Sequence, residues 1–312
     1  MLDLSAVISE MLSEIFGKNL MNYWLGVLLA ILSGIFSNIG AVLQKMVVNK
    51  VPDEAKLMRS LIKNPIWVLG LISGMGVGAA LFMLAQYYIG PTLIPGLMAA
   101  GLIVLAIGSV KIIGEELEVS EIIGIFLMIA AIAFIGFSGM DINIDLIDFL
   151  NIDLITRITI FTITLFIFAL ICEIFQRRGK YKGIFLANLS GSMFALSNFW
   201  ISPLFGTIAH VLSGRFIPEE LLIFIIAAII LVSVNILGIT KIQEAFRVAK
   251  ASHMVPIQQV PIQIMPPFYF IIVYLLPLPN LFSILFLTVG IGLVLISSYS
   301  LARRQAELEK IK

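Results

Sequence analysis

Residues 70–97 read GLISGMGVGAALFMLAQYYIGPTLIPGL, a run of 28 residues without a charged side chain. About 20 apolar residues are enough to cross the hydrocarbon core of a bilayer as a helix. Glycines recur every four residues at Gly70, Gly74 and Gly78, a spacing that lets a neighbouring helix pack closely or slide along this face. A Gly-Pro pair at 90–91 then interrupts the run. The stretch therefore predicts one membrane helix, a break, and the start of a second helix.

The whole chain has the same character. Of its 312 residues, 60% are hydrophobic and only 12% are charged, and the mean hydropathy is +1.08. A soluble domain needs more polar surface than this to cover its core, whereas lipid itself solvates apolar side chains. The composition therefore predicts a polytopic membrane protein. The net charge of +1 gives no indication of a nucleic-acid partner, and the single cysteine, Cys172, excludes an intramolecular disulfide.

Nine segments are long and apolar enough to span a membrane. Because a backbone in lipid must satisfy its own hydrogen bonds, each segment is predicted to be a helix, and the fold class is all-α and polytopic. The predicted spans are residues 24–46, 65–88, 91–113, 119–139, 154–176, 183–211, 220–243, 252–276 and 280–301.

The basic residues predict the orientation of these helices. With the N-terminus outside, and with Lys45 set aside because it lies at a helix end, 16 Lys and Arg residues fall on the inner side and three on the outer side. Cytoplasmic loops carry the excess of Lys and Arg, so we expect a multi-pass cell-membrane protein with its C-terminus in the cytoplasm. Residues 1–23 place apolar side chains at helical spacing opposite acidic ones. This pattern fits either an amphipathic segment on the membrane surface or a partly ordered tail.

Short sequences recur at a near-constant separation along the chain. LSGIFSN at 32–38 has a counterpart in LSGSMFALSN at 189–198, and Gly124 has one in Gly290. Four helices return the chain to its starting side and a fifth crosses once, so the second four insert upside down, an arrangement typical of secondary transporters. The predicted parts are an N-terminal segment (1–23), repeat one (24–139), an acidic outer loop with a linking helix (140–182), repeat two (183–301) and a cytoplasmic tail (302–312).

Prolines fall in the helices that occupy the same place in the two repeats. An interior proline removes a backbone donor and frees a carbonyl, which is tolerated at membrane depth only against protein or a water-filled cavity. Matching interrupted helices are the best sequence indication of a transporter's substrate site, although prolines also kink helices merely for packing. The predicted helix breaks are Pro91, Pro95, Pro256 and Pro261.

Amide and hydroxyl side chains lie on the same helices and their neighbours. Gln259 and Gln263 are four residues apart and share a helix face, and a buried amide without partners costs about 1–3 kcal/mol. Either a polar cavity or hydrogen bonds between helices must satisfy them. His253, one turn earlier, is either structural or a group that titrates near neutral pH. The candidate substrate-binding residues are Asn38, Gln44, Gln86, Thr92, Asn198, Asn235, Gln259 and Gln263.

Charged groups are confined to the ends of the predicted helices. Glu173, for example, lies one turn from Arg177 at the end of its helix, and we expect the two to pair. Proton-coupled carriers place a carboxylate within the membrane, so coupling through such a group is disfavoured. The sequence also lacks recognisable enzyme motifs and clusters of Cys and His. We therefore predict no catalytic residue, no metal ligand and no cofactor.

One part of the chain resembles a known family. Residues 75–94, MGVGAALFMLAQYYIGPTLI, followed by GEEL at 114–117, resemble the drug/metabolite transporter superfamily, which includes EamA-like proteins, and most closely its NIPA-like branch. The resemblance implies nine helices, an outside N-terminus and a transport role, and for the NIPA branch it implies magnesium as the cargo. Glu115 matches the glutamate of the family's turn. The glutamate that the branch has after Gly-Val-Gly is Ala79 in this sequence.

The sequence is compatible with three functions. The first is a carrier of a small polar solute or metabolite by alternating access, because the candidate site contains amides without buried acids. The second is a NIPA-like transporter of magnesium or another divalent cation. The third is a membrane interaction protein that transports nothing. The expected partners are the lipid bilayer and, for the first two functions, a small-molecule or ion substrate; a homodimer is compatible with all three.

Overall fold

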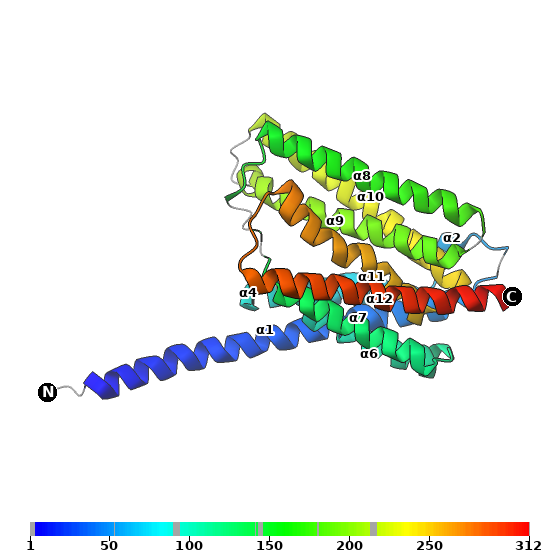
Figure 1. The fold of residues 1–312 in the computed structure, drawn as a ribbon, viewed down its shortest axis with the longest axis horizontal. Helices are drawn as coiled ribbons and strands as arrows, with labels where there is room; N and C mark the ends of the chain where they lie inside the picture. Colours follow the sequence, from blue (N-terminus) through cyan, green and yellow to red (C-terminus); the bar gives the residue numbers. More distant parts are fainter. Residues whose placement is uncertain are drawn as a thin grey trace.

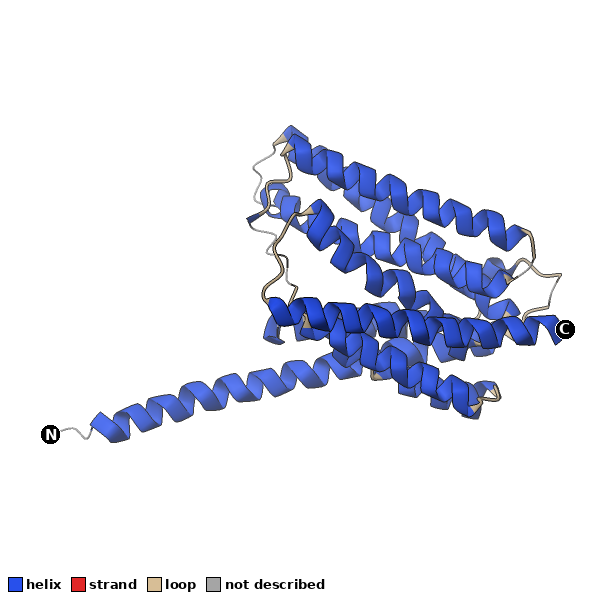
Figure 2. Cartoon of the chain, viewed as in Figure 1, coloured by secondary structure: helices blue, strands red, loops and turns tan. Residues whose placement is uncertain are grey.

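The computed structural model describes residues 4–52, 54–89, 94–140, 142, 146–179, 181–212 and 217–311. In the described part of the chain the regular structure is helical, and it includes three π-helical segments, labelled η (Figure 2). The first half contains α1 (Leu4–Val48), α2 (Leu57–Ile62), α3 (Pro65–Leu71), η1 (Ile72–Gly78), α4 (Ala79–Ile89), α5 (Ile94–Met98), α6 (Gly101–Gly108), η2 (Ser109–Ile113) and α7 (Val119–Phe137). The second half follows the linking helix α8 (Ile152–Arg177) and contains α9 (Lys182–Leu212), α10 (Pro218–Val248), α11 (Ala251–Phe268), η4 (Tyr269–Val273) and α12 (Leu281–Ile311).

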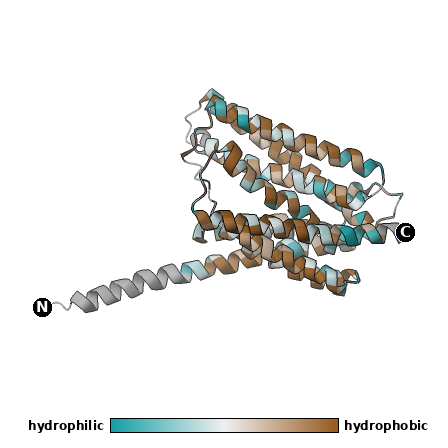
Figure 3. Cartoon of the chain, in the orientation of Figure 1, coloured by the Kyte–Doolittle hydropathy of each residue, from teal (hydrophilic) through white to brown (hydrophobic). Residues whose placement is uncertain are grey.

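The number and type of the helices confirm the predicted fold class. Among the described residues, eight helical stretches are long and apolar enough to cross a membrane. The remaining predicted span, 252–276, corresponds to α11 and η4, whose glutamines and prolines lower its hydropathy and whose first half is buried inside the bundle. Apolar residues cover most of the helices, while hydrophilic residues are more frequent towards their ends (Figure 3). This distribution is expected of a protein whose outer surface faces lipid.

The helices form two groups with α11 between them (Figure 1). On one side α9 packs against α8, α10 and α11; on the other α7 packs against α12, and α1 against α3, η1, α4 and α6. One large apolar core joins helices of both halves, and a second lies between α8, α9 and η4. The predicted close-packing face of Gly70, Gly74 and Gly78 lies against α1, because a Cβ built on Gly70 would lie 2.9 Å from the carbonyl oxygen of Gly40.

The two halves repeat the same hydrogen bond between their first two helices. The Ser33 hydroxyl of α1 donates to the carbonyl oxygen of Gly78 at 2.7 Å. The Ser190 hydroxyl of α9 donates to the carbonyl oxygen of Gly238 in α10 at 2.6 Å. The separations in sequence between the equivalent residues, 157 and 160 positions, agree with the predicted repeat.

The glycine that follows this serine in each half makes an equivalent contact with the third helix of its half. A Cβ on Gly34 would lie 2.1 Å from the carbonyl oxygen of Met98, and a Cβ on Gly191 would lie 2.2 Å from that of Gln258. Only glycine permits a backbone approach of this kind. The first and third helices of both halves therefore cross at an equivalent glycine.

The last helices of the two halves, α7 and α12, pack against each other reciprocally. Gly124 of α7 faces the side chain of Leu301, and Gly290 of α12 faces Ile135. Both equivalent pairs, Gly124 with Gly290 and Ile135 with Leu301, are 166 positions apart. A contact in which each half uses the same residues on the other is the signature of two-fold symmetry.

The third helix of each half ends in the same kind of turn. After η2, Gly114 has φ of +78°, and the amide of Glu115 donates to the carbonyl oxygen of Ser109 at 2.8 Å. After η4, Leu275 has φ of +54°, and the amide of Leu276 donates to the carbonyl oxygen six residues earlier at 3.1 Å. These two turns lie at opposite ends of the bundle because the halves are inverted.

Two expectations about helix continuity need correction. The helix after the 90–91 break is interrupted again at Ala99–Ala100, between α5 and α6, rather than at Pro95, which lies inside α5. In the second half α11 continues through Pro256 and Pro261 without a break, since loss of single backbone donors does not end a helix that is packed against neighbours. Pro91 lies outside the described residues.

At the N-terminus the predicted boundary at residue 23 has no counterpart in the backbone, because α1 is one continuous helix. The side chains before Asn22 are outside the described part, so the surface location of residues 1–23 stays a prediction.

Candidate functional site

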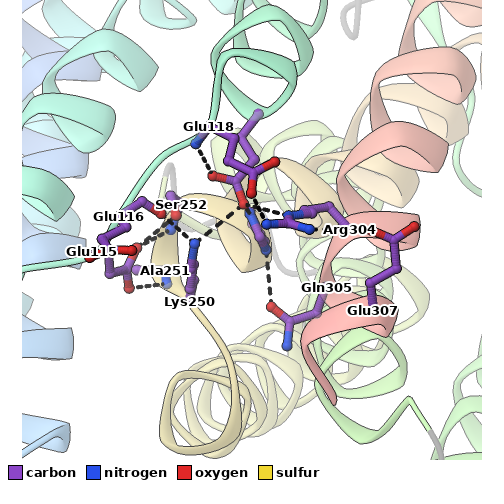
Figure 4. Close-up of polar contacts among 11 residues, drawn as sticks. Glu115, Glu116, Glu118, Lys250, Ala251, Ser252, Arg304, Gln305 and Glu307 are labelled. Carbon is purple, nitrogen blue, oxygen red and sulfur yellow. Dashed lines mark hydrogen bonds and ion pairs between the residues drawn. The ribbon is translucent and has the colours of Figure 1, made fainter. Parts of the chain in front are cut away.

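Polar contacts between the two halves gather at one end of the bundle. This end carries the loops after α1, η2, α8 and α10, together with the C-terminal part of α12, and is called the basic end (right in Figure 1). It is the end predicted to face the cytoplasm. The loop and helix ends that meet here come from positions far apart in the sequence, so the packing of the halves brings their charged groups together (Figure 4).

A buried histidine joins three helices at this end. His253, in the first turn of α11, has no exposed surface. Its Nε2 lies 2.7 Å from Glu121 Oε1 of α7, and its Nδ1 lies 3.0 Å from Gln305 Oε1 of α12. Both ring nitrogens therefore have a polar partner on another helix. His253 therefore ties the last helices of both halves to the start of α11.

Glu121 is the hub of this cluster. Its side chain is fully buried, and it accepts a hydrogen bond of 2.6 Å from the backbone amide of Glu118 as part of a capping box at the start of α7. Besides His253, Lys250 Nζ lies 3.3 Å and Arg304 Nε lies 3.7 Å from Glu121 Oε1. A buried carboxylate needs such partners, because an unpaired charge there is strongly destabilising.

Glu115 caps a helix of the other half. Its Oε1 accepts the backbone amide of Ala251 at 2.7 Å, and its Oε2 accepts the amide of Ser252 at 3.1 Å and the Ser252 hydroxyl at 2.7 Å. The residue at the N-cap position of α11, Lys250, provides no capping side chain. The carboxylate thus satisfies two amides that α11 itself leaves open, at the positive end of the helix dipole. Glu115 belongs to the turn before α7, so the cap joins the two halves.

Lys45 makes the complementary contact at the end of α10. Its Nζ donates to the carbonyl oxygens of Phe246 and of Ala249, the latter at 2.7 Å, and the residue is buried. A cation at the carbonyl end of a helix is stabilised by the helix dipole. Each of α10 and α11 is therefore capped, at the end where they meet, by a charged side chain of the first half.

A chain of amide hydrogen bonds lies beside Lys45. Gln243 of α10 donates from Nε2 to Gln44 Oε1 of α1, and its own Oε1 accepts the indole N–H of Trp67 at 3.1 Å. Gln44 was predicted as a substrate-binding residue, and the structure uses it here in a contact between α1 and α10.

The other predicted site residues are dispersed over the bundle. Gln263 is buried, and its Nε2 donates to Gln259 Oε1 at 3.1 Å. Asn38 is half-buried and donates to the carbonyl oxygen of Gly34 at 2.9 Å. Asn235 donates to the Ser197 hydroxyl at 2.7 Å. The Asn235 bond joins α10 to α9, as the alternative of hydrogen bonds between helices expects, whereas the other two bonds lie within single helices.

Two of the predicted residues are exposed, and a third is not described. Gln86 of α4 and Asn198 of α9 are exposed, and Thr92 lies outside the described residues. The substrate-binding role of all eight candidates stays a prediction. The expected pair of Glu173 and Arg177 is confirmed at 3.0 Å, and Glu173 also lies 3.1 Å from Lys241 of α10.

The cluster around Glu121 was not predicted. Glu121 and His253 are 132 positions apart, and Arg304 is farther along still, so no local spacing connects them. The only sequence signal was an acid three residues after Glu118 at the start of an apolar segment, which indicates a capping box. Within the described residues no group of three or more His, Cys, Asp and Glu side chains is arranged to hold a metal ion.

Comparison with known proteins gives one match. Residues 21–274 match the family described as Magnesium transporter NIPA, which covers most of the chain, including both halves up to η4. No curated protein and no solved structure matches this chain.

Proposed function

Because the chain belongs to the NIPA family of magnesium transporters, and is thus a membrane transporter, we propose that it moves a small polar, uncharged or zwitterionic solute by alternating access between its two inverted halves. In this proposal the basic end faces the cytoplasm of a cell membrane, because its loops hold most of the Lys and Arg residues. The solute would pass between the crossing of α1 with α5 and the equivalent crossing of α9 with α11.

The distribution of charge carries the choice of solute. In the middle of the candidate spans, the described polar side chains are amides and hydroxyls such as Gln263, Asn38 and Ser190, and the acidic residues lie near the helix ends. Amides and hydroxyls offer both donors and acceptors without net charge. A neutral or zwitterionic solute can exchange its hydrogen bonds to water for such groups without leaving an uncompensated charge in the membrane.

Magnesium is the second candidate, and the family match favours it. Mg²⁺ is usually held by one or two carboxylates together with water. Ala79 stands where the resemblance places a glutamate, and it begins α4 directly after η1. A magnesium route through this chain would therefore depend on amide, hydroxyl and backbone oxygens around a hydrated ion.

Purified protein in liposomes separates the two candidates. One set of vesicles encloses a magnesium-sensitive dye, and a second set is used for counterflow of radiolabelled small polar metabolites, tested in pools. We expect saturable counterflow of at least one pool and no dye response above that of empty liposomes. Magnesium influx without uptake of any metabolite would overturn the proposed cargo. Absence of both fluxes from well-folded protein would support the interaction-protein alternative instead.

A gain-of-function variant makes the comparison sharper. Ala79→Glu restores the family's glutamate at a position next to η1. If the natural protein does not carry magnesium because it lacks this group, Ala79→Glu is expected to add magnesium influx and to reduce metabolite counterflow. Ala80→Glu, which adds the same charge one position along the helix, is the control for a non-specific leak.

A further inference from the structure

We propose that Glu115 is the positioning residue that holds the basic end closed, and that its carboxylate must leave the start of α11 whenever that end opens. The Glu115 latch is defined as this carboxylate together with the amides of Ala251 and Ser252 and the Ser252 hydroxyl. The inference rests on the proposed alternating access, but the test below measures opening of the basic end itself, independently of transport.

The latch joins the parts that must separate. Glu115 lies in the turn between η2 and α7 of the first half, and Ala251 and Ser252 begin α11 of the second half. Three hydrogen bonds converge on this one carboxylate, at 2.7, 3.1 and 2.7 Å. Hydrogen bonds to a charged group are among the strongest in proteins, and here they also satisfy otherwise free amides of a helix N-terminus. Moving α11 away from the first half breaks all three together.

The neighbouring acid provides a natural comparison. Glu116 is exposed, and its backbone carbonyl, rather than its carboxylate, accepts the hydrogen bond from Lys250. Removing the carboxylate of Glu115 or of Glu116 changes the net charge of the turn equally. Only the first change removes the cap of α11. Any difference between the two variants therefore reports the cap and not the charge.

The equivalent turn at the opposite end, residues 274–280, carries no acidic side chain. Leu275 and Leu276 repeat the backbone geometry of Gly114 and Glu115, including the amide that donates to a carbonyl oxygen six residues earlier. Leu276 places an apolar side chain where Glu115 places a carboxylate. A carboxylate is therefore present at this turn only at the basic end, where it favours the contact of α11 with the first half.

Two buried serines are suitable reporters of opening. Ser109 has no exposed surface, and its hydroxyl has no hydrogen-bond partner among the described residues, so Ser109→Cys alters little. It lies at the start of η2, beneath the Glu115 turn. Ser138 is equally buried at the other end of α7. Each cysteine is introduced separately into the Cys172→Ala background, and its labelling by a membrane-impermeant maleimide is followed in nanodiscs, where both ends are accessible.

We expect Glu115→Ala to raise the labelling rate of Ser109→Cys by about tenfold to a hundredfold, the range over which loss of charged hydrogen bonds shifts an equilibrium. Glu116→Ala should leave that rate unchanged. Glu115→Gln, which keeps an oxygen acceptor, should fall between them. Labelling of Ser138→Cys should not rise in any of these variants.

Equal labelling of Ser109→Cys in the Glu115→Ala and Glu116→Ala proteins would overturn the latch. So would a parallel rise at Ser138→Cys, because that pattern means general unfolding. If the parent transports solute but the two variants label alike, the latch fails and the proposed function stands. If Glu115→Ala opens the basic end selectively in a protein that transports nothing, the proposed function fails and the latch stands.

Discussion

Lys45 in α1 donates a hydrogen bond of 2.7 Å to the carbonyl oxygen of Ala249, which directly follows α10. The same ammonium group donates to Phe246, so a first-half cation closes the end of a second-half helix. Lys45→Met keeps the length of the side chain and removes the charge. We expect this substitution to lower the free energy of unfolding by about 1.5–3 kcal/mol, the contribution of hydrogen bonds to a charged group. Lys50→Met, at an exposed position two residues after α1, should change it by less than about 0.5 kcal/mol. Denaturant unfolding in detergent measures both, and equal effects would contradict the assigned role.

The glycine crossings predict severe and equivalent effects in the two halves. Gly34→Ala and Gly191→Ala each place a methyl group about 2 Å from a backbone oxygen that cannot move aside. Each should lower the unfolding free energy by at least about 2–3 kcal/mol, or prevent accumulation of folded protein. Gly292→Ala in α12 meets no atom within 4 Å and should be neutral or slightly stabilising. Monodisperse yield by size-exclusion chromatography and melting temperature provide the readout. Normal stability of the Gly34 variant would mean that α1 and α5 are not in this close contact.

Replacing Ser190 should lower the stability of the protein more than replacing its equivalent, Ser33. Ser33→Ala loses one hydrogen bond to Gly78, worth about 0.5–1.5 kcal/mol. Ser190→Ala loses the equivalent bond to Gly238 and also removes the acceptor for Gln258 Nε2, which now donates to Ser190 at 2.8 Å. An unsatisfied buried amide adds about 1–3 kcal/mol, so the Ser190 variant should be the less stable of the two. Melting temperatures in the reverse order would contradict this network.

The buried hub at Glu121 should be much more sensitive than the exposed acids around it. Glu121→Gln leaves Lys250, Arg304 and His253 without their shared counter-charge, and removal of one partner from a buried ionic cluster costs about 3–5 kcal/mol. Glu307 also lies 3.3 Å from Arg304, but its side chain is 44% exposed, so Glu307→Gln should cost less than about 1 kcal/mol. Thermal unfolding of the two variants under identical conditions tests the difference. Equal melting temperatures would mean that the cluster is open to solvent.

Transport assays can test the predicted substrate-binding residues. If the solute passes along α11, Gln263→Ala should reduce the counterflow rate by about tenfold, the effect of losing one good polar contact of roughly 1.4 kcal/mol. Thr164→Ala, at an exposed position on the linking helix α8, should leave the rate unchanged. Both proteins must first be matched for yield and melting temperature. A normal rate for the Gln263 variant, or an equal loss for both variants, would remove Gln263 from the path.

The fold could be predicted from sequence because its main determinants are local. Hydropathy marks each span. The recurrence of LSG makes Ser33 equivalent to Ser190, and Gly34 equivalent to Gly191, in the two halves. The π-helical segments and the interruption at Ala99–Ala100 were not predictable in the same way. They depend on contacts between helices, such as the hydroxyl of Ser33 on the carbonyl of Gly78, and not on the intrinsic preferences of the segments themselves.

The charged cluster at the basic end could not be predicted from the sequence. Amides within membrane helices are rare and therefore stand out in the sequence as candidates for a polar site. Glu115, Glu121 and Lys250, by contrast, look like ordinary solvated charges at helix ends. Their partners, among them His253 and residues of α12, become neighbours only when the inverted halves pack together. A charge at the end of a membrane helix can therefore be as constrained as one in the middle, and its spacing in sequence does not reveal this.

The unequal turns at Glu115 and Leu276 have an evolutionary consequence. A duplicated chain begins with two interchangeable halves, so its inward and outward orientations begin with equal energies. With a carboxylate at one turn and a leucine at the other turn, the two orientations no longer have equal energies. This change does not touch any group along the cargo's path. Under the Glu115 latch, resting orientation and cargo selectivity are separate inherited traits. Selection can then reset the direction in which an empty carrier waits by changing one residue, while the choice of cargo is left as it was.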